Sequence, residues 1–356
     1  MTANAASISE QRGRRYLRYQ AYIWRFLARI GFYIHNFAHP RPPSPSFYHT
    51  FTTKSLANAA SSPTTLHLAV YVPADYGVQT KIHGRKYPVV VLFHGGGFTM
   101  GTGIDDARWA TIVVNEVDAV VVSVCYRLAL EHPFPTAVED GLEAVLFIAA
   151  HADVFGVDIS KMALSGFSAG GNLAFTVPLR LQEHILSMQA DHGGPEIPFA
   201  VLPIPHLVSI VAWYPSLDNR LTRAQRRSSC PRPDKTLPPI LTNLFDESYF
   251  PDPSCKTSIH ASPAAAPDEM LLQALPDTVA IFVCEWDMLL QEGKDFAERL
   301  EGLGKQVSCT VIKGRRHGFD KTPNPFKLDP TIDLHYRQGC DTLRKAFETQ
   351  SRCPKL

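Results

Sequence analysis

Ser168 stands in a short motif that could make it a nucleophile. It is the central residue of Gly166-Phe167-Ser168-Ala169-Gly170, the pattern G-x-S-x-G, which follows a short apolar run and precedes a helical segment. A serine on a sharp strand-to-helix turn has a strained backbone, and glycine on both sides removes the collisions that side chains would make there. The pattern by itself also occurs in ordinary turns, so the prediction of a nucleophile depends on the strand–turn–helix setting.

Three consecutive glycines could stabilise the charge that such a nucleophile creates. Gly95, Gly96 and Gly97 directly follow the strand-like run "YPVVVLFH". Attack of a serine on an ester leaves a negative oxygen, which fixed backbone N–H donors can bind. We therefore predict an oxyanion hole formed by the amides of Gly95, Gly96 and Ala169. An ordinary glycine-rich turn is the alternative, and a phosphate loop lacks its Lys-Ser/Thr ending. Four residues are expected to support these groups: His94, Gly97, Gly166 and Gly170.

An acid and a base follow later strand-like runs. Asp287 comes after "TVAIFVCEW", and His317 comes after the next run, "VSCTVIKG". In the chain order serine, acid, histidine, His317 would take the Ser168 proton and Asp287 would hold the imidazole ring. Glu285 is the second choice for the acid, because it lies within the expected strand. Five other histidines lack a strand-end position followed by Gly-Phe: His132, His151, His206, His260 and His335.

The elements that must position these residues alternate along the chain from about Leu66. Continuous apolar runs such as "DAVVVSVCYRL" and "LVSIVAWYP" are typical of strands covered on both faces. Helical segments such as "DDARWATIVVNEV" and "EGKDFAERLEGLG" separate them. This alternation predicts an α/β protein with a doubly wound, mainly parallel sheet. Pro178 is expected to kink the helix that follows Ser168 or to make it irregular.

Two segments interrupt the alternation. One is the N-terminal region through about Pro45, and the other runs from about Ser216 to Ser262 and is rich in Pro, Arg and Ser at its centre. An excursion of this length between sheet elements is too long for a simple connection. We therefore predict an N-terminal helical cap segment (1–50), a core (51–215 and 263–356) and a cap insertion (216–262).

Composition restricts the partners. Lys plus Arg number 35 against 34 Asp plus Glu, a net charge of +1, which offers no electrostatic reason to expect nucleic acid. The seven cysteines are odd in number and never spaced as CxxC, which indicates a reduced compartment and neither a disulfide frame nor a zinc site. We expect no metal and no cofactor, a cytoplasmic location and a small-molecule substrate. The oligomeric state is not indicated.

The segment "RYLRYQAYIWRFLARIGFYIH" predicts an amphipathic helix. Arg18, Arg25 and Arg29 interrupt it too often for a membrane span, and the polar stretch that precedes Arg14 does not predict a secretory signal. Packing on the domain is the preferred interpretation. A lid over the substrate pocket and a contact with a membrane surface stay open.

Five blocks resemble one family when they are taken together and in order. They are "HGGGF" at 94–98, "YRLALEHPFP" at 126–135, "GFSAGGNLA" at 166–174, "DMLLQEG" at 287–293 and "HGF" at 317–319. From about Leu66 to Phe347 the chain resembles the hormone-sensitive-lipase-like esterases and their arylacetamide-deacetylase relatives. The resemblance implies an α/β-hydrolase fold with an eight-stranded type of sheet, helices on both faces and a helical cap. It also implies the catalytic roles already suggested for Ser168, Asp287 and His317.

The chain departs from the family pattern at two positions. Leu130 stands where the family usually has proline, which we expect to loosen a turn, and Phe167 stands where aspartate is usual, which we expect to alter the pocket wall. The favoured function is a serine hydrolase acting on hydrophobic, aryl or acetyl esters, including those of secondary metabolism. An acyltransferase, a lactonase or a polyketide-releasing thioesterase would use the same residues. A non-catalytic receptor is less favoured, because the receptors of this family have lost the histidine that His317 represents.

Overall fold

The computed structural model describes residues 2–53, 64–191, 203–322, 324, 326 and 329–352, and the side chains of 2–12, 191, 351 and 352 lie outside this description. Within it, eight strands form one sheet in the order β1-β2-β4-β3-β5-β6-β7-β8. Their bounds are β1 Phe47–Thr52, β2 Thr65–Tyr71, β3 Tyr87–Phe93, β4 Val120–Cys125, β5 Val157–Phe167, β6 Leu207–Trp213, β7 Thr278–Trp286 and β8 Gln306–Arg316.

The sheet is parallel from β4 to β8 and antiparallel only at its β1–β2–β4 edge. Val120, Val122 and Val124 of β4 point to one buried cluster, whereas Val121 points to the other. Successive side chains of a strand face opposite sides, so burial on both faces requires an uninterrupted apolar run. The predicted fold class, a mainly parallel sheet of eight strands between helices, is confirmed.

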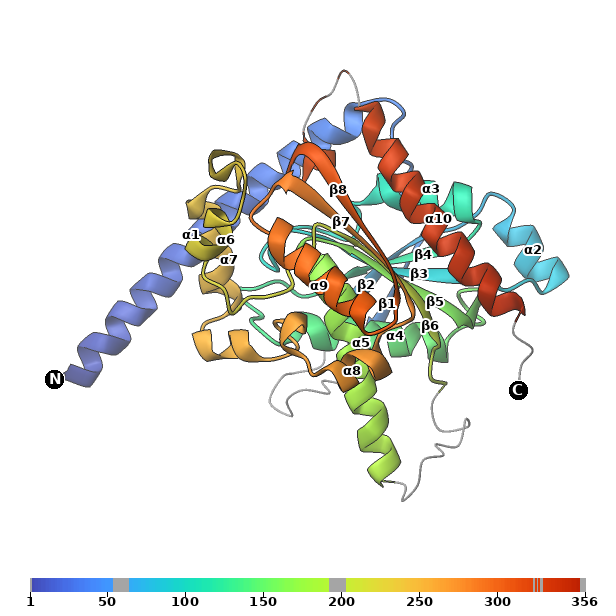
Figure 1. Ribbon diagram of the computed structural model, residues 1–356, viewed down its shortest axis with the longest axis horizontal. Coiled ribbons are helices and arrows are strands. Elements are labelled where there is room, and N and C mark those ends of the chain that lie inside the picture. The colour runs from blue at the N-terminus through green and yellow to red at the C-terminus, as the bar shows by residue number, and fades with distance from the viewer. Residues whose placement is uncertain are drawn as a thin grey trace.

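Ten α-helices surround the sheet in the described part of the chain (Figure 1). Helices α4, α5, α8 and α9 contribute side chains to the buried cluster on one face, and α3 and α10 to the cluster on the other. The bounds are α1 Thr2–Phe37, α2 Tyr76–His83, α3 Ala107–Val117, α4 Thr136–Ala150, α5 Ala169–Asp191, α6 Arg223–Ser228, α7 Pro239–Tyr249, α8 Asp268–Ala274, α9 Leu290–Gly302 and α10 Pro330–Arg352. Short 3-10 helices span Pro233–Lys235, Pro253–Thr257, Pro263–Ala265 and Phe319–Lys321.

A helix that packs against the sheet was not expected from the sequence. Helix α10 has no counterpart among the predicted helices, although its buried residues Ile332, Tyr336, Cys340, Leu343 and Phe347 are spaced three or four apart. That spacing is the signature of an amphipathic helix and would have identified it. Pro178 lies inside helix α5, and the expected kink or irregularity at this residue stays a prediction.

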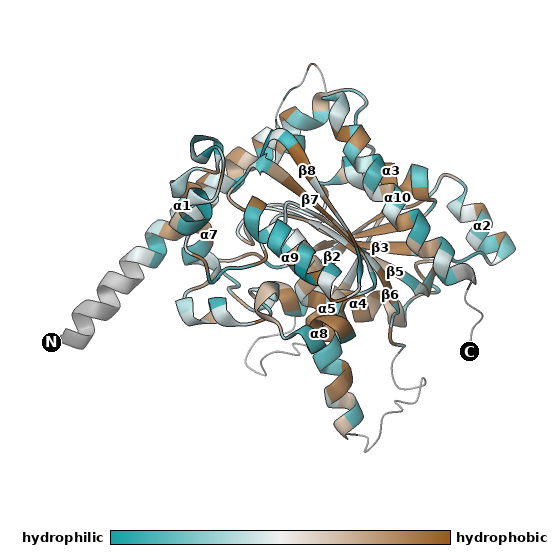
Figure 2. Cartoon of the chain, in the orientation of Figure 1, coloured by the Kyte–Doolittle hydropathy of each residue, from teal (hydrophilic) through white to brown (hydrophobic). Residues whose placement is uncertain are grey.

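Helices α1, α6 and α7 lie together on one side of the molecule, beside the ends of β7 and β8 (Figure 1). Figure 2 shows the contrast between the hydrophobic central strands and these helices, on which hydrophilic and hydrophobic residues alternate. No helix among the described residues has the length and hydropathy to cross a bilayer.

Candidate active site

Ser168 lies between the last residue of β5 and the first residue of α5. Its φ is +54°, a strained value for a residue with a side chain. A Cβ at Gly166 would stand 2.1 Å from the carbonyl oxygen of Gly170, and a Cβ at Gly170 would stand 1.9 Å from that of Phe93. Because backbone cannot yield at such distances, both flanking positions require glycine, and the turn holds the serine hydroxyl clear of the sheet.

The structure brings Ser168, His317 and Asp287 into one hydrogen-bonded chain. The Oγ of Ser168 is 2.8 Å from Nε2 of His317, and Nδ1 of His317 is 2.6 Å from Oδ2 of Asp287. Since a carboxylate only accepts, Nδ1–H donates to Asp287, which leaves Nε2 free to accept the serine proton. Asp287 is 1% exposed, and its other oxygen accepts from the amide of Leu289 at 3.2 Å. The ring of Tyr214 contacts His317 edge-on, with centroids 4.7 Å apart.

The competing candidates have other partners. Glu285 accepts from the amide of Gly314 at 2.8 Å and from Lys313 at 3.2 Å, and these bonds lower the pKa of its carboxyl. His260 pairs with Glu183, and His335 with Gln338. His151 and His206 bond to backbone carbonyls. Within the described residues, no hydrogen bond joins any of these groups or His132 to Ser168.

The glycine loop, residues 94–101, adopts backbone conformations that residues with a side chain reach only with strain. Gly96 has a φ of +113° and Gly97 a φ of +60°, and a Cβ on Gly96 would stand 2.1 Å from the carbonyl oxygen of Met100. In the described part of the chain, the backbone N–H groups of Gly96, Gly97 and Ala169 donate to no protein carbonyl. Gly95, Gly96 and Gly97 line the same cavity as Ser168 and His317. These amides are therefore available to a ligand oxygen.

His94 is buried at the start of this loop and holds it through a hydrogen bond to Gly95. It is 1% exposed, and burial lowers the pKa of its imidazole to about 4, so the ring is neutral near pH 7. Its Nδ1–H donates to the carbonyl oxygen of Gly95 at 2.8 Å. Tyr126 stacks on the ring at 4.1 Å and donates its hydroxyl to the His94 carbonyl at 2.7 Å. His94 thus contacts the loop and not the Ser168–His317 pair.

Two cavities meet at Ser168 and His317. One, of about 160 Å³, extends past Phe167 to Ala28 and Phe32 of helix α1. The other, of about 30 Å³, leads under helices α6 and α7, where Arg223, Phe245 and Tyr249 line it. Phe167, the residue that departs from the family pattern, therefore forms part of the pocket wall.

A buried charge cluster, made up of Lys321, Asp106 and Asp320, lies beside the first cavity and was not predicted from the sequence. Lys321 Nζ is 2.5 Å from Asp106 Oδ1 and 3.2 Å from Asp320 Oδ2. Tyr214 donates to Asp320 at 2.6 Å, and Tyr336 donates to the other oxygen. Because Tyr214 also contacts His317, the cluster fixes one wall around the imidazole. The signal in the sequence is weak, since the two aspartates lie far apart along the chain.

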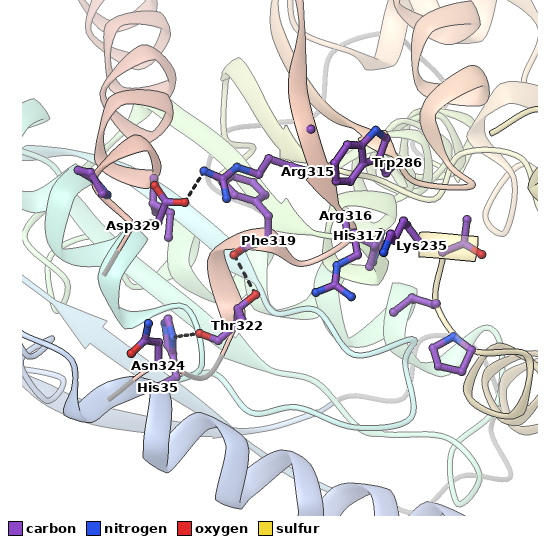
Figure 3. Close-up of a pocket in the computed structure, with 16 residues that line it drawn as sticks. His35, Lys235, Trp286, Arg315, Arg316, His317, Phe319, Thr322, Asn324 and Asp329 are labelled. Atoms are coloured by element: carbon purple, nitrogen blue, oxygen red, sulfur yellow. Dashed lines mark hydrogen bonds and ion pairs between the residues drawn. The ribbon is translucent and has the colours of Figure 1, made fainter. Parts of the chain in front are cut away.

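A larger groove, of about 620 Å³, lies on the outer side of His317 and does not reach Ser168 (Figure 3). Arg315 is paired with Asp329 there, whereas the Arg316 guanidinium has no ion-pair partner among the described residues. Trp286, Phe319 and Ile332 provide apolar walls. Ser168 lines the two smaller cavities and does not line this groove.

The described residues hold no group of His, Cys, Asp and Glu that could bind a metal ion. Six cysteines in this part of the chain are free, and Cys353 lies outside the described residues.

Comparisons with known proteins agree with this architecture. A family model described as alpha/beta hydrolase fold matches residues 90–321. Carboxylesterase 20 of Arabidopsis thaliana is 37% identical over 78% of this chain and 82% of its own length. Arylacetamide deacetylase-like 2 of Homo sapiens is 32% identical over 67% of this chain and 69% of its own.

Solved structures give the same result. An esterase of Pyrobaculum calidifontis superposes with a TM-score of 0.71 at 27% identity, covering 91% of this chain and 92% of its own. A structure from a study of two fungal esterases of Rhizomucor miehei superposes with a TM-score of 0.72 at 25% identity. It covers 93% of this chain and 91% of its own. The fold thus defines an α/β hydrolase. The chain belongs to the hormone-sensitive-lipase-like esterases of that family, and it is a carboxylic ester hydrolase.

Proposed function

We propose that the chain cleaves esters through an acyl-enzyme on Ser168, with His317 as the base and Asp287 as the group that orients it. The observation that carries this proposal is the unbroken chain of contacts, 2.8 Å from Ser168 Oγ to His317 Nε2 and 2.6 Å from His317 Nδ1 to Asp287 Oδ2. Asp287 is buried, so its charge stabilises the imidazolium that forms during attack.

The proposed reaction has two steps. Ser168 Oγ attacks the ester carbonyl while its proton passes to Nε2 of His317, and the carbonyl oxygen becomes an oxyanion held by the available amides of Gly96, Gly97 and Ala169. His317 then protonates the alcohol oxygen as the C–O bond breaks. In the second step His317 takes a proton from water, whose oxygen attacks the acyl carbon, and Ser168 leaves as a hydroxyl with the acid as product.

The substrate class that we propose is a small lipophilic ester. The cavity beside Ser168 is lined mainly by glycine and by apolar residues, including Phe32, Met100, Phe167, Leu241 and Phe245. Such walls favour hydrophobic acyl or alcohol groups over charged ones.

The test is hydrolysis of p-nitrophenyl esters of increasing chain length by the wild type and by Ser168→Ala. We expect Ser168→Ala to lower kcat by at least about 10⁴-fold, because among the described residues no other hydroxyl or thiol is hydrogen-bonded to His317. Ser228→Ala, an exposed serine of α6, is the matched control and should leave kcat unchanged. Undiminished hydrolysis by Ser168→Ala would refute the proposal.

The orienting acid is tested separately. Asp287→Asn should lower kcat by about 10³–10⁴-fold because asparagine cannot hold the imidazole in its charged form. Glu285→Gln should have no comparable effect, since Glu285 bonds to Lys313 and Gly314. Adding a competing alcohol and analysing the products distinguishes hydrolysis from acyl transfer.

A further inference from the structure

Helix α1 has two opposite faces, and one of them packs on the core. Ala21 and His35 are buried, at 1% and 2% exposure. Arg25 donates to the carbonyl oxygens of Thr99 at 2.8 Å and Ala129 at 2.7 Å. These contacts hold α1 on the molecule from its middle to its C-terminal end.

The opposite face is exposed and apolar. Seven of its residues alternate in spacing between three and four, and their side chains are 37–72% exposed: Tyr16, Tyr19, Ile23, Phe26, Ile30, Tyr33 and Phe37. At about 100° per residue, this stripe lies on the side of the helix away from Ala21 and His35. Figure 1 shows α1 extending along one side of the molecule and beyond the core at its N-terminal end. Monomeric proteins rarely leave an apolar surface of this extent uncovered.

The charges around this face indicate what covers it. Between Gln11 and Phe37 the sequence contains six arginines and no lysine, aspartate or glutamate, and one of the six, Arg25, is paired with Glu131 on the core side. A heptad-like stripe could pair with a second copy, but arginines would then face arginines without an acidic partner. Aromatic side chains combined with arginines fit an anionic lipid surface, where the rings lie among the headgroups and the guanidinium groups bind phosphate.

A cavity connects this face with Ser168. It has a volume of about 270 Å³, and its walls include Trp24, Leu27 and Gly31 of α1. Leu27 is also 47% exposed, so the cavity opens beside the apolar stripe. Five residues line both this cavity and the one that contains Ser168: Ala28, Phe32, Met100, Leu241 and Lys321. A lipophilic molecule leaving a membrane at α1 would therefore meet an apolar passage to the serine.

We propose that helix α1 docks the enzyme on anionic membrane surfaces, and that lipophilic esters dissolved in the lipid reach Ser168 through the cavity between α1 and α7. The second half of the proposal rests on the ester hydrolysis proposed above. The docking does not depend on catalysis.

Docking is tested by flotation of the full chain with two kinds of vesicle, one of phosphatidylcholine alone and one of equal parts phosphatidylcholine and phosphatidylserine. We expect the wild type to bind the anionic vesicles and to dissociate at high salt. Ile23→Ser/Phe26→Ser/Ile30→Ser should weaken binding at least about tenfold. Arg14→Gln/Arg15→Gln/Arg18→Gln should weaken it by about 100-fold, on the order of fivefold for each arginine.

The matched control changes three exposed apolar residues elsewhere, Val78→Ser/Ile82→Ser/Leu334→Ser, and should bind as the wild type does. Wild type that stays unbound on the phosphatidylserine vesicles overturns the docking. A wild-type dimer in sedimentation that the α1 serine variant converts to monomer, with no vesicle binding, overturns it as well and assigns the face to a second copy. Ser168→Ala must still bind vesicles, which separates a failure of docking from a failure of catalysis.

The route of the substrate is tested with two esters. The α1 serine variant should hydrolyse water-soluble p-nitrophenyl acetate like the wild type, which also shows that it is folded. Its rate on p-nitrophenyl palmitate embedded in anionic vesicles should fall at least about tenfold. Equal rates of wild type and variant on the embedded ester overturn the proposed route.

Discussion

Asp106 and Asp320 contact the same lysine, yet their pKa values shift in opposite directions. Burial raises the pKa of Asp106 to about 6, although Lys321 opposes the shift. Burial acts on Asp320 in the same direction, but Lys321 and the hydroxyls of Tyr214 and Tyr336 outweigh it and lower the pKa of that carboxyl. The difference arises because Asp320 accepts two tyrosine hydrogen bonds that Asp106 lacks.

This difference predicts a pH dependence of stability. Between pH 4 and 6 the folded state holds a proton on Asp106 that the unfolded chain has lost, so the free energy of unfolding falls as the pH rises through this window. Asp320 has the opposite effect on the free energy of unfolding. Its ionised carboxyl stabilises the folded state above about pH 4, and this stabilisation is lost as the pH falls from about 4 through the lowered pKa of the folded state.

Asp106→Asn should remove the first effect. We expect the free energy of unfolding of the wild type, relative to that of the variant, to fall by about 2–3 kcal/mol from pH 4 to pH 7. Urea denaturation across this range measures it, with the exposed Asp295→Asn as control. Parallel pH profiles for wild type and Asp106→Asn would contradict the assignment.

At the scale of elements, a buried ion pair joins helix α6 to helix α9. Arg226 of α6 and Glu292 of α9 lie 2.9 Å apart, and both side chains are at most 3% exposed. Glu292 also accepts from the amide of Leu217 at 2.7 Å. Because α9 begins shortly after Asp287, at Leu290, the pair couples the position of α6 to the element that follows Asp287.

Removing one partner of this pair should leave an unpaired buried charge. We expect Arg226→Met to lower the free energy of unfolding by about 3–5 kcal/mol, and Arg226→Met/Glu292→Gln to recover a large part of that loss. Urea denaturation of the two single variants and the double variant gives the coupling energy. Arg232→Met, which breaks an exposed pair with Asp234, is the control and should change little. Additive losses would show that the two residues are not coupled.

At the scale of the whole molecule, the active-site cavity is assembled from segments far apart in the chain. Ala28 comes from α1, Met100 from the glycine loop, Leu241 from α7 and His317 from the end of β8. The apolar passage therefore exists only when the N-terminal helix, the insertion and the core pack together.

Narrowing that passage should change the chain-length preference. Ala28 lines both the cavity that contains Ser168 and the cavity beside α1, so Ala28→Trp places a large ring where these two meet. We expect the ratio of kcat/KM for p-nitrophenyl octanoate to kcat/KM for p-nitrophenyl acetate to fall at least about tenfold. Steady-state kinetics with both esters measures the ratio, and Leu272→Trp, at an exposed position of α8, is the control. An unchanged ratio would show that long acyl groups do not occupy this passage.

The sequence by itself determined the alternation of strands β2 to β8 with helices α3, α4, α5 and α9, because strands buried on both faces require continuous apolar runs and the turn around Ser168 requires glycines. For the same reason Ser168, Asp287 and His317 could be proposed from strand-end positions alone. Strand β1 and helix α10 were not predicted. Only the tertiary structure decided which groups meet: the bonding of Glu285 away from His317, the buried Lys321 cluster and the two faces of α1. These depend on contacts between residues in distant parts of the chain, and local periodicity carries no information about such contacts.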